Sequence, residues 1–368
     1  MPPLHLLIKP VSGQCNLRCD YCFYADEANN RGVKSYGEMS LSTLESLVSE
    51  AFGYEAADSV TFAFQGGEPT LIGLDFYKSL ISFANEYNVR KKPVSYAIQT
   101  NGTLIDDAFA GFFAENKFLV GLSLDGGKEI NDGHRTYPEG GGSYAGVINA
   151  AATFDRHGVD YNILTVVTAQ VAKHIGKIYG FFKKNNFLYQ QYIPCLDPFG
   201  EPRGARPYSL TPALYGFFLK TLFDLWYRDI KNGVKVYIRY FENLAGVIKG
   251  YMPESCGMSG HCSFQHVVEA DGSVYPCDFY AMDGYLIGRI GEGGFEKING
   301  GEKRREFIEK SLHRDAKCDS CKWLALCGGG CRRDREPVVD GRLSLNYYCE
   351  AVKDFYEYSY GRMKELLS

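Results

Sequence analysis

The stretch that decides the fold is GQCNLRCDYCFY, residues 13–24. It contains Cys15, Cys19 and Cys22, with three and then two residues between them. Three thiolates are one ligand short of a closed tetrahedral metal site. A loop with these gaps can place three thiolates on one face of a cubane iron–sulfur cluster, which leaves one iron with the open position that a catalytic metal needs. A zinc site completed by a distant residue, or plain core cysteines, is the alternative.

Composition narrows the class of protein. The chain has 368 residues, 45% of them hydrophobic, and a net charge of −4, so we expect a large α/β domain plus a smaller one and no nucleic-acid partner. No apolar run spans a bilayer and the start lacks the features of a signal peptide, which predicts a cytoplasmic protein without a membrane partner. Eight of the twelve cysteines fall between Cys256 and Cys349. In a reducing cytosol such clustering indicates metal ligands rather than disulfides.

The first two thirds of the chain alternate strand and helix patterns. Strands are expected at 4–11, 59–64, 94–100, 117–125, 161–167 and 189–196, and helices from Ser42 (with Glu45 completing a capping box), around 74–87, 106–116, 143–158 and 174–185, and from Thr211. Six such units in series predict an α/β fold with a parallel sheet, a partial (β/α)6 TIM-type barrel whose chemistry lies at the carboxyl ends of the strands. We expect the barrel at 1–235, a linker at 236–254 and a smaller cysteine-rich domain at 255–368.

The cysteine triplet, followed by an aromatic residue at the end of the first strand, resembles the signature of radical S-adenosylmethionine (SAM) enzymes. GGEP at Gly66–Pro69, after the second strand, is similar to their second motif. The resemblance implies that the amino and carboxylate groups of SAM chelate the open iron. It also implies that an electron from the cluster breaks a carbon–sulfur bond of SAM and gives a 5′-deoxyadenosyl radical. In such enzymes the protein positions the cofactors and excludes water.

By this resemblance a SAM pocket is expected on the barrel rim, formed by Tyr21, Gly66, Gly67, Glu68, Ser123, Arg135 and Leu196. The two glycines would let the backbone approach the SAM amino group, and Arg135 would clamp its carboxylate. Ser123 would bond the ribose or the carboxylate, while Tyr21 and Leu196 would pack on the adenine. Bracing of the loop is the alternative role of Glu68.

The later cysteines resemble the SPASM domain, the extension with two clusters that is found in radical SAM enzymes acting on peptides. The resemblance implies two auxiliary [4Fe–4S] clusters, one held by Cys256, Cys262, Cys277 and Cys331 and the other by Cys318, Cys321, Cys327 and Cys349. Three [4Fe–4S] clusters are therefore expected. A pair of structural zinc sites is the alternative, and Cys195 is left over as a buried inert thiol.

Nearly the whole chain is similar to the anaerobic sulfatase-maturating enzymes, through segments such as FAFQGGEPTL, QTNGTLID and VVEADGSVYPCDFY. That family oxidises a Cys or Ser side chain of a sulfatase to Cα-formylglycine after hydrogen abstraction from Cβ. We expect Asp278, next to Cys277, to be the base that takes the thiol or hydroxyl proton. An Asp that only caps a turn is the alternative. Tyr24, Gln65, Gln99 and Asn101 are expected to contact the substrate peptide.

The expected partners are an unfolded or nascent sulfatase polypeptide and a reducing electron donor such as flavodoxin or ferredoxin. The competing hypothesis is another SPASM maturase that crosslinks or epimerises a ribosomal peptide. Many such enzymes carry a winged-helix module before the barrel, whereas the first strand here begins by residue 4. An iron–sulfur electron carrier or zinc scaffold is a third possibility, and it leaves the open triplet and GGEP unexplained.

Overall fold

The structure is a computed structural model that describes residues 2–339 and 341–367. Its internal contacts divide the chain into two compact units. Unit 1 comprises the chain up to Leu124 together with Asn131–Asn162 and Phe264–Arg305, and unit 2 comprises Asp125–Ile130, Ile163–Ser263 and the chain from Glu306. Each unit therefore combines segments from both sides of the predicted linker, and the predicted domain boundaries stay a prediction.

Unit 1 contains the first four β/α units. Its parallel strands are β1 (Leu4–Ile8), β2 (Val60–Phe64), β3 (Val94–Thr100) and β4 (Phe118–Ser123), paired in that order. The helices that follow them are α2 (Leu41–Gly53), α3 (Leu74–Tyr87), α4 (Asp107–Glu115) and α6 (Tyr144–His157). Buried aromatic rings fill the space between strands and helices; Tyr77, for example, meets Phe64 edge-on with ring centroids 5.1 Å apart.

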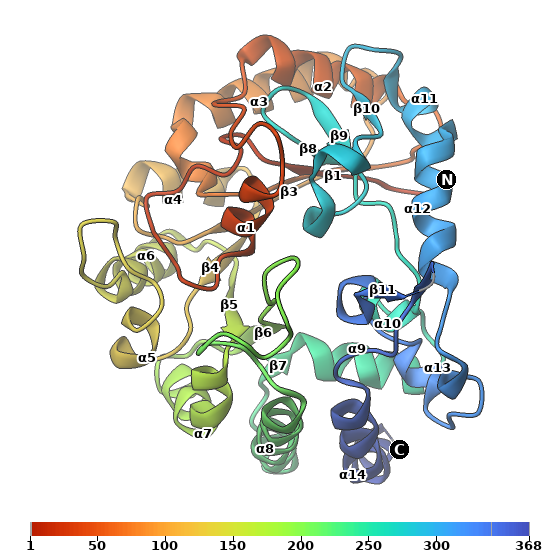
Figure 1. Ribbon diagram of the computed structural model, residues 1–368. Coiled ribbons are helices and arrows are strands. Elements are labelled where there is room, and N and C mark those ends of the chain that lie inside the picture. Colours follow the sequence, from red (N-terminus) through yellow and green to blue (C-terminus); the bar gives the residue numbers. More distant parts are fainter. Residues whose placement is uncertain (1, 340, 368) are drawn as a thin grey trace. The chain divides into compact units, whose positions relative to one another are not determined.

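A short segment from the cysteine-rich region extends this sheet. β8 (Val267–Val268) pairs in parallel with β1, and β9 (Ser273–Tyr275) and β10 (Gly288–Arg289) continue it antiparallel. Figure 1 shows β8 and β9 in cyan on the side of the red β1 that faces away from β2. The 3₁₀ turn η2 (Asp278–Tyr280) comes three residues after β9, so the segment that carries Asp278 belongs to the same unit as the cysteine loop that follows β1.

Unit 2 contains the last two β/α units and most of the later cysteines. β5 (Tyr161–Val167), β6 (Tyr189–Pro194) and β7 (Tyr237–Ile238) are parallel. The long helices are α7 (Ala169–Lys184), α8 (Pro212–Lys231), α9 (Arg239–Ile248) and α14 (Cys349–Leu367), and α8 packs against both α7 and α14. The cysteine-bearing elements are short, as in α10 (Cys256–Ser259) and α13 (Leu324–Cys327).

The six expected β/α units are confirmed, but two helix starts were predicted wrongly. α2 is capped by the extended residue Ser40, whose hydroxyl accepts a hydrogen bond from the N–H of Thr43. The expected capping box of Ser42 and Glu45 is therefore absent, and Glu45 instead accepts from the Tyr87 hydroxyl at 2.7 Å. α7 begins at Ala169 rather than near 174, because Thr168 caps its first turn.

Within residues 2–339 and 341–367, no helix combines the length and the apolar character that a membrane crossing requires.

Candidate active site and metal centres

The cysteine loop of unit 1 connects β1 to α1 (Phe23–Asn29). None of Cys15, Cys19 and Cys22 forms a disulfide, and Cys22 is the N-cap of α1. Burial raises the pKa of the Cys22 thiol, while hydrogen bonds from the backbone N–H groups of Ala25 and Tyr24 oppose that shift. Such a thiol stays protonated until a metal displaces the proton. Three thiols and no fourth one in the loop fit an iron–sulfur cluster with one open iron.

The GGEP loop after β2 packs directly against this cysteine loop. Gly67 donates its N–H to the carbonyl of Ser12 at 3.0 Å, and Glu68 donates to the carbonyl of Gln14 at 2.8 Å. A Cβ added at Gly67 would lie 1.8 Å from the Gln14 carbonyl oxygen, so only glycine allows this close approach. Gly66, at φ +119°, adopts a conformation that favours glycine. The two glycines thus hold the cysteine loop, and their expected contact with SAM stays a prediction.

The Glu68 carboxylate is buried and hydrogen-bonded to residues of unit 1. Its carboxylate accepts hydrogen bonds from the N–H and hydroxyl of Thr70, from the Thr100 hydroxyl at 2.8 Å and from the Asn101 N–H at 2.7 Å. These four bonds join the ends of β2 and β3. They support the alternative that Glu68 braces the loop, and a direct role in SAM binding stays a prediction.

The two residues at the end of β3 that were expected to contact peptide differ in exposure. Asn101 donates to Asn16 at 2.9 Å and to the Cys15 sulfur at 3.8 Å, and its side-chain oxygen accepts from Thr103. It therefore orders the cysteine loop. Gln99 is exposed. A peptide contact for either residue stays a prediction.

Two of the expected SAM residues lie together beside the cysteine loop. The Arg135 guanidinium lies 5.5 Å from the ring centroid of Tyr21, and both residues are buried. Ser123 is the last residue of β4 in the same unit. Leu196 follows β6 in unit 2, and its place in a SAM pocket stays a prediction.

A cavity in unit 2 brings together all four cysteines that were assigned to the second auxiliary cluster. It has a volume of about 500 Å³, and its lining includes Cys318, Cys321, Cys327 and Cys349 beside the ring of Trp323. All four are free thiols. Four thiols and no vacant position fit a closed [4Fe–4S] site, which suits electron transfer rather than substrate coordination.

Three of the four ligands assigned to the first auxiliary cluster also belong to unit 2. Burial is the main cause that raises the pKa of the Cys331 thiol, and the nearby thiols of Cys256 and Cys262 raise it further. Gly260 and Gly328 approach so closely that a Cβ on Gly260 would lie 1.9 Å from the Gly328 carbonyl oxygen. Cys277 belongs to unit 1, and its membership of this ligand set stays a prediction.

Asp278 lies in unit 1 among residues that the sequence analysis assigned to catalysis and peptide binding. Its carboxylate Oδ2 accepts hydrogen bonds from the Tyr24 hydroxyl at 2.8 Å and from the Gln65 amide. Gln65 also donates to the Tyr24 oxygen at 2.8 Å. Asp278 is only 5% exposed, whereas Tyr24 and Gln65 are half-buried. The side chain thus faces other segments of the unit, which argues against a mere turn cap.

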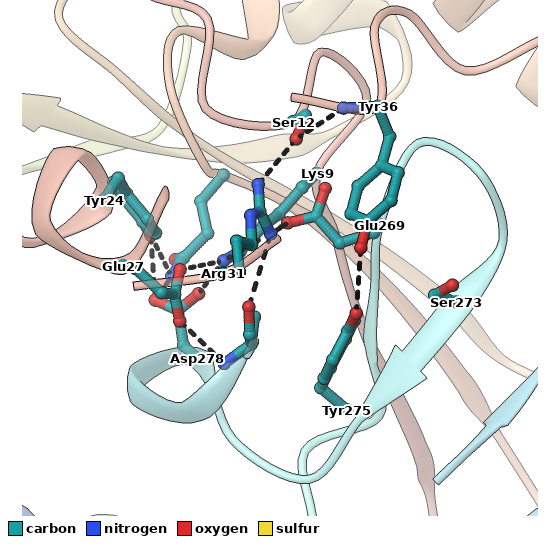
Figure 2. Close-up of polar contacts among 12 residues, drawn as sticks. Lys9, Ser12, Tyr24, Glu27, Arg31, Tyr36, Glu269, Ser273, Tyr275 and Asp278 are labelled. Carbon is teal, nitrogen blue, oxygen red and sulfur yellow. Dashed lines mark hydrogen bonds and ion pairs between the residues drawn. The ribbon is translucent and has the colours of Figure 1, made fainter. Parts of the chain in front are cut away.

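Behind Asp278 lies a buried charge network that sequence reasoning missed (Figure 2). Lys9 pairs with Glu27 at 2.7 Å, and Arg31 pairs with Glu269 at 2.6 Å. Lys9 Nζ also lies 3.5 Å from Oδ1 of Asp278 and 3.8 Å from Glu269. The signal available in the sequence was an acidic residue inside the apolar run VVEA, at Glu269, and a lysine directly after the apolar run LHLLI, at Lys9.

The electrostatics of this network follow from burial and an unequal number of charges. Burial alone lowers the pKa of Lys9, but Glu27, Asp278 and Glu269 outweigh it and hold that pKa above its usual value. Burial raises the pKa of Glu27 to about 7 against the opposing effect of Lys9. Three carboxylates share two cations, and the excess negative charge raises both pKa values, although burial is the larger cause for Glu27. Burial and the nearby Asp278 also raise the pKa of Tyr24, which is therefore a neutral donor.

Comparisons with known proteins agree with this geometry. Residues 10–182 match the radical SAM superfamily, and residues 256–322 match the iron–sulfur cluster-binding domain called SPASM. A cysteine-type anaerobic sulfatase-maturating enzyme of Clostridium novyi is 50% identical over 97% of this chain and 95% of its own. The chain belongs to the anaerobic sulfatase-maturating enzyme family.

The sequence identity of this chain differs between the cysteine-type and the serine-type members of the family. A serine-type enzyme of Bacteroides thetaiotaomicron is 31% identical, over 97% of this chain and 88% of its own. A solved structure described as native anSMEcpe with bound AdoMet and Cp18Cys peptide superposes with a TM-score of 0.95 at 46% identity, and the match covers 99% of both chains. The match to family members therefore extends over both units.

Proposed function

We propose that this protein is a radical SAM enzyme that oxidises a cysteine of a sulfatase polypeptide to Cα-formylglycine. The observation that carries the proposal is the convergence of Asp278, Tyr24 and Gln65 beside the cysteine loop of unit 1. Oxidation of a thiol or hydroxyl side chain releases its proton, and here a carboxylate oxygen that can accept the proton lies beside a hydroxyl and an amide that can hydrogen-bond the target. The cysteine-type relative at 50% identity, against 31% for the serine-type one, favours cysteine as the target.

The cofactors and the residues have separate tasks. When bound, SAM and the clusters supply the radical that takes a hydrogen atom from the substrate Cβ and accept the electron that the substrate releases. Cys15, Cys19 and Cys22 would hold the SAM cluster, and the cavity of unit 2 would hold a closed one. Asp278 Oδ2 accepts the thiol proton, and the half-buried Tyr24 and Gln65 orient the target side chain toward that oxygen.

Further partners belong to the same proposal. The client is an unfolded or nascent sulfatase segment, because a target side chain must reach the largely buried Asp278. A low-potential donor such as flavodoxin or ferredoxin supplies the first electron. A cytoplasmic setting is proposed because it keeps the twelve cysteines reduced for cluster assembly.

The test is mass spectrometry of sulfatase-derived peptides after anaerobic incubation with reconstituted enzyme, SAM and dithionite. The cysteine peptide should show replacement of its CH2SH group by an aldehyde, trapped as a hydrazone. The matched serine peptide should be converted more slowly, with loss of two hydrogens. Formation of 5′-deoxyadenosine without any aldehyde on either peptide would contradict the proposed function.

A further inference from the structure

The two oxygens of Asp278 have different surroundings. Oδ2 receives the two hydrogen bonds from Tyr24 and Gln65. Within the described part of the chain, Oδ1 is buried and accepts no hydrogen bond. The group that faces it is the Lys9 ammonium at 3.5 Å. A buried carboxylate oxygen without a hydrogen bond depends on such a counter-charge, because the desolvation of an unpaired charge is costly.

Lys9 is held from several directions, so its ammonium has little freedom to move away from Asp278. Its backbone N–H donates to the Val268 carbonyl at 2.8 Å, which fixes the start of the side chain between β1 and β8. Its Nζ is bonded to Glu27 at 2.7 Å and lies 4.8 Å from the Tyr24 ring centroid. The residue is 1% exposed. Glu27 in turn accepts the N–H of Ala281 at 2.7 Å, which ties the network to the end of η2.

The backbone of Asp278 is fixed independently of Lys9. Its N–H donates to the Gln265 side-chain oxygen at 3.0 Å. Loss of Lys9 would therefore leave the turn in place and act on the carboxylate, which Glu27 and Glu269 would then repel. A rotated carboxylate would present neither oxygen in the position that Tyr24 and Gln65 define.

We propose that Lys9 is a positioning residue that engages Oδ1 of Asp278 and thereby presents Oδ2 to the substrate. This inference rests on the proposed function, since it assigns Lys9 a role in the proton transfer to Asp278. Lys9 touches neither substrate nor cofactor in this role. Its effect is confined to the step after hydrogen abstraction, so SAM cleavage and product formation respond differently.

The test compares Lys9→Met with Arg31→Met in enzyme reconstituted anaerobically. Both variants remove one buried cation from the same network, but Arg31 contacts Glu269 and Ser12 and does not contact Asp278. The measured quantity is the ratio of 5′-deoxyadenosine to formylglycine formed, together with iron content and peptide affinity. Lys9→Met should raise the ratio roughly 10-fold or more at unchanged peptide affinity, the scale expected for a displaced catalytic group. Arg31→Met should keep the parent ratio.

A third variant, Lys9→Met with Glu27→Gln, covers the case in which Lys9→Met fails to fold. Removing both charges of the Lys9–Glu27 pair restores the electrostatic balance of the network, so stability should return while the ratio of 5′-deoxyadenosine to formylglycine stays high. Lys9→Arg should bring this ratio back toward the parent value. A parent ratio in folded Lys9→Met, its restoration in the double variant, or an equal rise in Arg31→Met would overturn the positioning role. A parent enzyme that forms no formylglycine would instead overturn the proposed function.

Discussion

The cysteine loop of unit 1 and the thiol cavity of unit 2 use the same ligand in opposite ways. The loop presents three thiols in the same unit as the buried charges of Lys9, Glu27 and Asp278. The cavity encloses four thiols, and its carboxylates, such as Glu350 and Glu357, are exposed. Buried charge that is fixed in advance belongs to a site where a proton moves, whereas a fully thiolate-lined cavity with charge only at its rim suits a cluster that passes electrons.

The largest expected effect separates the two thiol sites. Replacing Cys15, Cys19 and Cys22 together by Ala should remove about four of about 12 irons and abolish SAM cleavage, because the open iron is lost. Replacing Cys318 and Cys321 by Ala should also remove about four irons but leave SAM cleavage measurable. Iron analysis and chromatography of 5′-deoxyadenosine check both. Equal loss of SAM cleavage in the two variants would break the proposed distinction between an open and a closed site.

The next effect concerns the proton acceptor. Asp278→Asn keeps the shape of the side chain but cannot accept the thiol proton. The variant should still form 5′-deoxyadenosine, while formylglycine falls by about 10²-fold or more, the scale of a lost general base. Because Asp278 is next to Cys277, the comparison is valid only if the Asp278→Asn variant has the same iron content as the parent enzyme. A full-iron variant that makes formylglycine at the parent rate would show that Asp278 is not the base.

The four thiols that line the cavity of unit 2 were grouped correctly by the family resemblance, whereas the charge network was not predicted. The spacing of Cys318, Cys321 and Cys327 is local, so the chain itself records their proximity. Lys9, Glu27, Arg31 and Glu269 come from positions up to 260 residues apart in the sequence, and although Lys9 and Glu269 adjoin apolar runs, nothing in the sequence pairs them. The parallel pairing of β8 with β1 brings Glu269 to Lys9, and the segment after β1 adds Glu27 and Arg31.

The same limit explains the mixed outcome for the predicted site residues. Asp278 was predicted as the base from its position after Cys277, and Tyr24 and Gln65 as peptide contacts; the structure brings the three to one oxygen. Asn101 was also predicted as a peptide contact, but its amide orders the cysteine loop. The position of a residue along the chain can predict that it lies on the barrel rim. The direction of its side chain depends on neighbours that sequence periodicity does not reveal. The six β/α units follow from periodicity and were predictable.

A smaller effect is the pH dependence that the excess buried charge creates. The pKa of Glu27 is raised from 4.5 to about 7, so between these values the folded state binds a proton that the unfolded state has released. Stability should therefore fall as pH rises through this window, and the contribution of Glu27 is on the order of 1–3 kcal/mol. Glu27→Gln removes this titration. From pH 5 to pH 7.5 the melting temperature of the parent should fall relative to that of Glu27→Gln. A difference between the two melting temperatures that does not change with pH would mean that Glu27 stays ionised.

The smallest expected effect is that of Cys195→Ser, which tests the division of thiols between the sites. Cys195 is 3% exposed, and its Sγ donates to the Leu196 carbonyl at 3.7 Å, the contact of a protonated thiol rather than a metal ligand. The predicted assignment gives three of the other eleven cysteines to the open site and eight to the closed ones. Serine keeps a donor at this position, so we expect unchanged iron, unchanged formylglycine and a loss of stability within about 1 kcal/mol. A loss of about four irons would assign Cys195 to a cluster and would require one of the eight later cysteines to be released.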